Sequence, residues 1–188
     1  MNKMTSVKKL CICAICIALC CILPTAFHAV GLGTALSPMH IPALLCGLLL
    51  GPIYGAVCGI VGPVLASLTT GMPPLMRLLY MAPEICAYGL IAGLVMQLVR
   101  TRHLSADMYI SLVISMIAGR IVGGFAQWLV IAIMGSGQPF TVAIWATSYI
   151  VGTLPGVVAH LILIPMLVLV LEKARVIPVR YPKVKQGN

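Results

Sequence analysis

Charged residues are scarce in this sequence, and acidic residues are the scarcest. Asp, Glu, Lys and Arg together make up 8% of the 188 residues, and three residues are acidic. No charged residue occurs between Lys9 and Arg77, or between Arg120 and Glu172. Because a soluble domain carries about 25% charged residues, a water-soluble fold is excluded. The 12 Lys and Arg residues form short clusters between apolar runs, which is typical of a membrane protein and not of a nucleic-acid-binding surface.

Long apolar runs account for most of the chain, of which 61% is hydrophobic. A helix needs about 20 apolar residues to cross a membrane, and an open sheet cannot satisfy its backbone in lipid. The sequence therefore predicts an all-α membrane protein with six transmembrane helices in a single integral domain over residues 1–188. The expected spans, divided by glycine, proline and charge, are residues 10–30, 41–53, 55–71, 78–99, 108–134 and 143–171, followed by a basic tail at 173–188.

The basic residues predict the orientation of these helices. Ten of them precede the first span, separate the fourth from the fifth or follow the sixth, whereas Arg77 lies beside the fourth span at its opposite end. With six spans these clusters all fall on one side, so we expect both termini to be cytoplasmic. The first segment could instead be a signal peptide, but its apolar run continues to about Val30 without a convincing cleavage site, which favours a span.

The eight cysteines lie in the apolar runs, five of them in the first. No pair of Cys-x-x-Cys motifs and no Cys/His cluster of zinc-binding spacing accompanies them. We interpret them as small apolar packing residues. The sequence predicts no metal site and no cofactor.

Polar residues within the expected spans are the candidates for a binding site. An ionisable group costs about 2.5–3.5 kcal/mol to insert, so Glu84 and Arg120 are functional candidates. Each lies on a helical stripe of polar, aromatic or small residues, and a third stripe lies on the sixth span. Such stripes would suit an outward-open cavity for a small polar molecule, whereas the alternative is that the glycines and tyrosines only serve packing and the membrane interface. The expected substrate-binding residues are Arg120, Gln127, Glu84, Tyr80, Tyr88, Tyr149, Thr153 and, at an external connection, His40.

A pair of small residues marks the first span near its cytoplasmic end. Ala14 and Ala18 are spaced so that another helix can approach closely between them. This position would suit docking of a partner that supplies energy. The chain itself has no Gly-x-x-x-x-Gly-Lys-Ser/Thr phosphate loop, so it is not expected to hydrolyse ATP alone.

Three motifs together resemble a known family. They are the Ala-xxx-Ala pair, the stretch Ser-Pro-Met-His-Ile-Pro-Ala-Leu-Leu-Cys-Gly at 37–47 continuing into Gly-Pro-Ile-Tyr-Gly at 51–55, and the loop at 70–75. Over residues 8–172 the chain is similar to S components, the substrate-binding membrane subunits of energy-coupling-factor (ECF) vitamin transporters. It looks most like the pantothenate branch.

The resemblance implies a non-enzymatic subunit of a bacterial cell membrane. Such a subunit would bind a vitamin or cofactor precursor from outside, and a transmembrane coupling subunit with two ATPases would drive release inward. Ala14 and Ala18 would then form the docking face for the coupling subunit. Arg120 favours an anionic ligand such as pantothenate, whereas Glu84 with its two tyrosines would suit a neutral ligand such as pyridoxine.

Two other functions remain open from the sequence. An autonomous gradient-driven carrier would use Glu84 as its proton-coupled group. A membrane-embedded enzyme or biogenesis factor would need catalytic groups that the sequence does not display, because Glu84 alone among the three acids is placed for a site.

Overall fold

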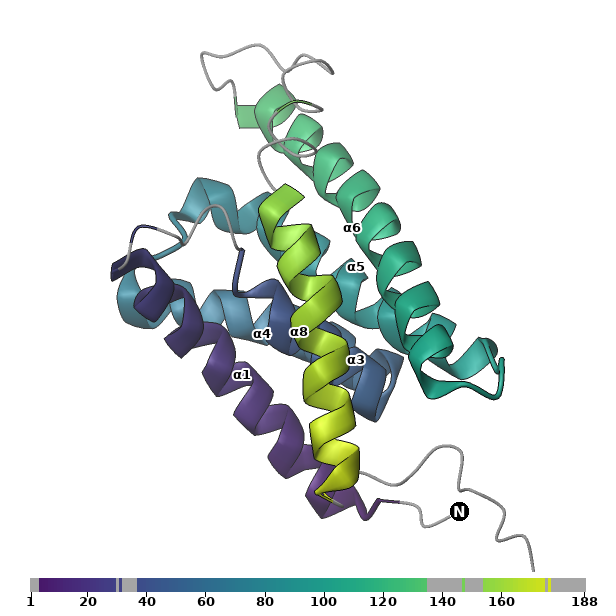
Figure 1. Ribbon diagram of the computed structural model, residues 1–188. Coiled ribbons are helices and arrows are strands. Elements are labelled where there is room, and N and C mark those ends of the chain that lie inside the picture. Colours follow the sequence, from purple (N-terminus) through teal and green to yellow (C-terminus); the bar gives the residue numbers. More distant parts are fainter. Residues whose placement is uncertain are drawn as a thin grey trace, which may run out of the picture.

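The structure is a computed structural model that describes residues 4–29, 31, 37–134, 147, 154–174 and 176. The described parts form six α-helices and no strand, which confirms the all-α prediction (Figure 1). The helices, labelled as in Figure 1, are α1 (Ser6–Ala29), α3 (His40–Leu50), α4 (Pro52–Thr70), α5 (Leu75–Leu98), α6 (Leu104–Met134) and α8 (Leu154–Lys173). The expected last span, residues 143–171, begins outside the described residues.

Five of the described helices are long and apolar enough to cross a membrane: α1, α4, α5, α6 and α8. Helix α3 has 11 residues, so its length is roughly 16 Å, about half of the 30 Å hydrocarbon core. The second expected span, residues 41–53, is therefore realised as a short helix that cannot cross alone. The chain is a multi-pass membrane protein.

Helix α3 lies at the centre of the bundle. It contacts α1, α4, α5, α6 and α8, and all of its residues except Leu49 are buried. On one side it shares an apolar core with α5, α6 and α8, through Leu44, Ala92 and Leu112 among others. On the other side it shares a second core with α1 and α4. A helix that is apolar all round is stable when it is enclosed in this way.

The break between α3 and α4 lies at Gly51, at the start of the Gly-Pro-Ile-Tyr-Gly stretch 51–55 that divides the two expected spans. Gly51 has φ 102°, a conformation that side chains with a Cβ rarely adopt. Pro52 then begins α4, where its missing N–H costs nothing. The Gly-Pro pair therefore ends one helix and starts the next with no intervening loop.

Three glycines bring the backbones of α3, α4 and α5 into contact. A Cβ at Gly47 would meet the Gly89 carbonyl, and a Cβ at Gly55 would meet both Gly47 and Gly89. Small residues allow such close approach between membrane helices, where dispersion contacts and not water exclusion hold helices together. This three-helix contact fixes α3 against α5.

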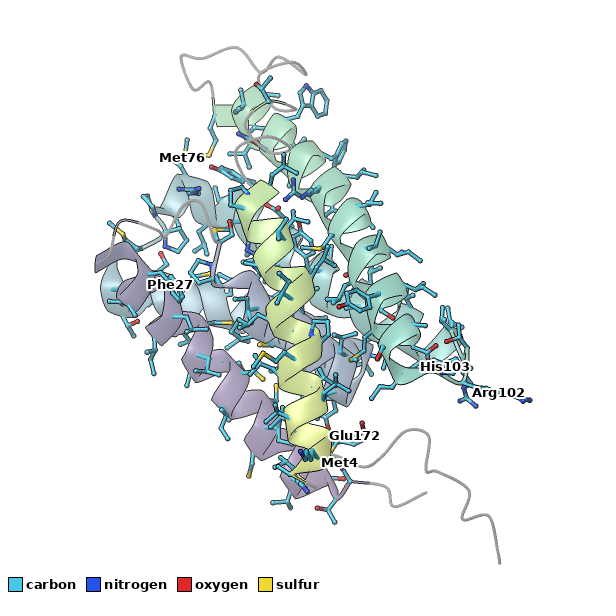
Figure 2. The ribbon with its side chains drawn as sticks, viewed as in Figure 1. Met4, Phe27, Met76, Arg102, His103 and Glu172 are labelled. Atoms are coloured by element: carbon cyan, nitrogen blue, oxygen red, sulfur yellow. The ribbon has the colours of Figure 1, made fainter. Side chains whose placement is uncertain are left out.

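The start of α1, the start of α6 and the end of α8 lie at the same end of the bundle. Met4, Leu104 and Leu171 pack against the same core cluster, and they mark the start of α1, the start of α6 and the end of α8. Figure 2 shows Met4 and Glu172 close together at one end and Met76 at the other. The described basic clusters therefore share one end, as expected from their distribution in the sequence.

The turn between α5 and α6 is fixed by an acid. The Asp107 carboxylate accepts hydrogen bonds from the Thr101 backbone N–H at 2.8 Å and from the Thr101 hydroxyl at 2.7 Å. Asp107 is fully buried, and these bonds offset the cost of burying its carboxylate. Asp107 thus has a structural role at the end of the bundle that carries the basic clusters.

The three-glycine contact makes a prediction about stability. Gly89→Ala places a methyl group against the Gly55 backbone, which cannot move aside as a side chain can. We expect it to lower the free energy of unfolding by roughly 1–3 kcal/mol. Thermal unfolding in detergent measures the loss. Ala87→Leu on the half-buried side of the same helix is the control, and equal stability of the wild type and Gly89→Ala would contradict the contact.

Candidate functional site

Four polar residues from three helices meet inside the bundle, and we call them the polar cluster: His40 of α3, Glu84 and Tyr88 of α5, and Arg120 of α6. The Tyr88 hydroxyl donates a hydrogen bond to Glu84 Oε1 at 3.5 Å, and His40 Nε2 lies 3.9 Å from the same oxygen. Arg120 interacts with the Tyr88 side chain. The structure therefore brings together four of the eight residues expected to bind substrate.

Glu84 lies deep in the protein. Its exposed fraction is 5%, and it lies nine residues from the start of α5, or roughly 14 Å along the helix axis. That depth is close to the middle of a 30 Å hydrocarbon core. A carboxyl group in such a place needs polar partners, and His40 and Tyr88 are positioned to provide them.

The position of His40 follows from the start of α3. The His40 backbone N–H and Nδ1 both lie 3.1 Å from the Ser37 carbonyl oxygen. Because a carbonyl only accepts hydrogen bonds, we assign the proton to Nδ1, which leaves Nε2 facing Glu84. The His40 ring also contacts Tyr88 edge-on, with centroids 4.9 Å apart.

His40 and Glu84 are complementary when one further proton lies between them. A neutral His40 protonated at Nδ1 would oppose an ionised Glu84 with two acceptors. A proton on either group removes that repulsion, giving an imidazolium beside a carboxylate or a neutral pair.

Two glycines of α6 make room for the cluster. A Cβ at Gly123 would lie 2.6 Å from the Glu84 carboxyl carbon, and a Cβ at Gly119 would lie 2.9 Å from the Tyr88 ring. These glycines form a notch in α6 that receives both α5 side chains. Gly123 lies three residues after Arg120, on the same face of the helix, so spacing alone points to it, whereas the need for Gly119 appears only when the helices are packed.

The other four predicted substrate-binding residues lie outside the polar cluster or outside the described residues. Tyr80 lies one turn before Glu84 and is half-buried, with both Glu84 and Arg77 close enough to act on it electrostatically. Gln127 lies one turn beyond Gly123, and its Oε1 is buried without a hydrogen-bond partner among the residues that the structure describes. Tyr149 and Thr153 lie outside the described residues.

His160 of α8 also approaches the polar cluster, although it is not among the residues that the sequence predicts to bind substrate. Its ring centroid lies 6.0 Å from that of His40, and its exposed fraction is 4%. One signal could have found it. His160 is four residues after Gly156, and so it continues the stripe expected on the last span.

Most of the cysteines lie on the opposite side of α3 from the polar cluster. Five of them are buried between α1, α3 and α4, and the Cys20 and Cys58 sulfurs are 4.0 Å apart. In the described part of the chain, no group of three His, Cys, Asp or Glu side chains is arranged to hold a metal ion. The buried cysteines are Cys13, Cys16, Cys20, Cys46 and Cys58.

Ala14 and Ala18 face away from the bundle. Both are exposed, and they continue in steps of four between the exposed Leu10 and Ile22. We call these four residues the docking stripe. Helix α1 lies against α3 and α4 (Figure 1), and its buried cysteines are on the side that faces them. The stripe is therefore an apolar helix surface with small residues at its centre.

Comparison with protein families identifies the class of the chain. The model of the family described as ECF transporter, substrate-specific component, matches residues 8–171. The match covers most of the chain, so the protein belongs to this family, and the resemblance noted from its motifs is confirmed. Members of the family are components of membrane transporters. Comparisons with curated proteins and with solved structures gave no match.

The notch in α6 predicts a specific energetic coupling. Gly123→Ala would force the Glu84 carboxyl group aside, and Glu84→Ala would remove the obstacle. In a double-mutant cycle measured by unfolding in detergent, we expect the pair to be less destabilised than the sum of the single variants, by about 0.5–3 kcal/mol.

A distant glycine provides the control for this cycle. Gly62→Ala would meet Cys20 of α1 instead, so its effect should add to that of Glu84→Ala. Additive behaviour of Gly123→Ala and Glu84→Ala would show that the carboxyl group does not occupy the notch.

Proposed function

We propose that this chain is the substrate-capturing S component of an ECF-type importer in a bacterial cell membrane. It binds a vitamin or cofactor precursor from outside, without enzymatic activity of its own. A transmembrane coupling subunit and two ATPases drive release to the cytoplasm. The observation that carries the proposal is the polar cluster, which places a carboxyl group, an imidazole and a phenol within otherwise apolar helices of a chain from this family.

The substrate site lies on the outer side of the polar cluster in this proposal. Arg120 and Gln127 are seven residues apart on α6, and thus two turns apart on one face. A guanidinium binds a carboxylate strongly, and an amide can both donate and accept hydrogen bonds. Glu84 packs into the α6 notch and contacts His40 and Tyr88. Its role is to position Tyr88 and Arg120 and not to contact the ligand.

A small organic anion with hydroxyl or amide groups suits this arrangement better than a neutral one. Pantothenate has this chemistry, with one carboxylate, one amide and two hydroxyls. Pyridoxine is the competing ligand, and it would require Glu84 to turn toward the site. Because Glu84 is 5% exposed and occupies the Gly123 notch, the anionic ligand is favoured.

Binding measurements on Arg120 variants test the ligand class. We expect Arg120→Ala to weaken pantothenate binding by roughly 10- to 100-fold, because a charge-assisted hydrogen bond contributes about 1.5–3 kcal/mol. Arg120→Lys should lose less affinity, since lysine keeps the positive charge but cannot form the two parallel hydrogen bonds of a guanidinium with a carboxylate. Isothermal titration of the purified chain gives both affinities.

Two controls accompany this titration. Arg102→Ala, in the turn at the other end of α6, removes the same charge far from the site and should leave affinity unchanged. Mass spectrometry of small molecules released from the denatured protein identifies the natural ligand. A neutral ligand, or pantothenate affinity that does not depend on Arg120, would refute the anionic assignment.

The docking stripe supplies the proposed contact with the coupling subunit. Ala14 and Ala18 are exposed and small, so a partner helix can approach the α1 backbone there. We expect Ala14→Trp to reduce ATP-driven uptake by at least about tenfold while the affinity for ligand stays within about twofold, because the stripe lies across α3 from the polar cluster. Uptake in vesicles with the partner proteins measures the first effect, and titration measures the second.

The matched control is Ile117→Trp, which places the same bulky residue on an exposed part of α6. It should transport normally. Normal transport by Ala14→Trp would reject the docking assignment.

The proximity of His40 Nε2 and Glu84 Oε1, 3.9 Å apart inside the bundle, favours a second candidate, an autonomous proton-coupled carrier. This function predicts uptake by vesicles that contain the chain alone, with loss of uptake on adding an uncoupler. The S-component proposal predicts no uptake without the partner subunits, so the same vesicles separate the two functions.

A further inference from the structure

An open groove lies on the outer surface of the bundle where α8 meets α6. It has a volume of about 390 Å³, and it is separate from the polar cluster and from the docking stripe. Tyr109 of α6 lines one side. The rest of the lining comes from α8 and includes Ile162, Pro165, Met166, Leu169 and Lys173. Lys173 is the charged residue of this lining.

The groove is apolar along most of its length. Ile162 and Met166 are 63% and 61% exposed, and they form its wall, whereas Pro165 is buried beneath them. Exposed apolar side chains in a spanning helix face lipid tails. A hollow among them is filled by a hydrocarbon chain more favourably than by water.

The length of the groove corresponds to one leaflet of the membrane. From Ile162 to Lys173 is 11 residues of α8, or roughly 16 Å, and half of a 30 Å hydrocarbon core is about 15 Å. Lys173 lies in the last turn of α8, at the end of the bundle that carries the described basic clusters. The positive-inside rule places this end in the cytoplasm.

The polar groups of the groove lie at its cytoplasmic end. Tyr109 lies five residues after the start of α6, which is roughly 7.5 Å along the axis and near the level of lipid headgroups. Its hydroxyl can donate a hydrogen bond there. Glu172 precedes Lys173 but does not line the groove. The groove thus ends in a cation and a hydrogen-bond donor.

We propose that this groove binds an anionic phospholipid of the cytoplasmic leaflet. One acyl chain lies along Ile162, Met166 and Leu169, and the Lys173 ammonium pairs with the headgroup phosphate. Charge complementarity and the one-leaflet length select this occupant over a partner helix, which would extend beyond the groove at both ends. The proposal does not depend on the identity of the transported substrate.

Native mass spectrometry of the full-length chain in detergent tests the proposal. The probes are phosphatidylglycerol and phosphatidylcholine with identical acyl chains. We expect phosphatidylglycerol to be retained about fivefold more than phosphatidylcholine, because the attraction of one lysine for anionic lipid at a membrane surface corresponds to a ratio of this size. Lys173→Gln should abolish this preference. Met166→Trp, which fills the groove, should reduce retention of both lipids.

Lys8→Gln is the matched control, since Lys8 is exposed at the same end of the bundle and does not line the groove. It should keep the preference for phosphatidylglycerol. If Lys8→Gln and Lys173→Gln lost the preference for phosphatidylglycerol equally, the preference would reflect a general attraction of the lipid to surface charge, and the proposal would be overturned. Equal retention of the two lipids by the wild type would also overturn the proposal. So would a dimer of the wild-type chain that the Met166→Trp substitution dissociates, because the groove would then hold a second copy of the chain.

Discussion

The contact among Gly47, Gly55 and Gly89 is the constraint on which the rest of the structure depends. In lipid, water exclusion does not drive helices together, so association requires close backbone contact and satisfied polar groups. The three glycines allow the close backbone contact directly, and through it they allow the polar groups to meet. They bring α3 against α5, and this approach places His40, the first residue of α3, beside Glu84. Without that contact, the carboxyl group would lie in an apolar bundle with Tyr88 as its neighbour and no imidazole.

Helix α3 connects the polar cluster with the helix that carries the docking stripe. Its Cys46 lies in the core that it shares with α1, whose opposite side carries Ala14 and Ala18. Its His40 contacts Tyr88 and faces Glu84. A shift of α3 would therefore change both the position of α1 and the polar cluster. Packed interiors transmit such shifts because they have little free volume.

The sequence predicted the features that arise from local patterning. Apolar runs gave the helices, and the spacing of four residues placed Glu84 and Tyr88 on one face of α5, where the structure has them in contact. It could not predict that α3 is a short central helix, because a helix buried in protein and a helix facing lipid are equally apolar. The approach of His40 and His160 to one site also depends on how three helices pack, which no spacing within one helix encodes. The notch formed by Gly119 and Gly123 also depends on how helices pack and could not be predicted from spacing within one helix.

The brevity of α3 also affects how the chain enters the membrane. A segment of 11 residues cannot remain across the bilayer by itself when it leaves the ribosome. The Gly51 and Pro52 junction joins it to α4 with no intervening loop. The stable position of α3 therefore depends on its contacts with α4 and with α5, which supplies Gly89. The position of α3 within the membrane and the packing of this region are thus coupled.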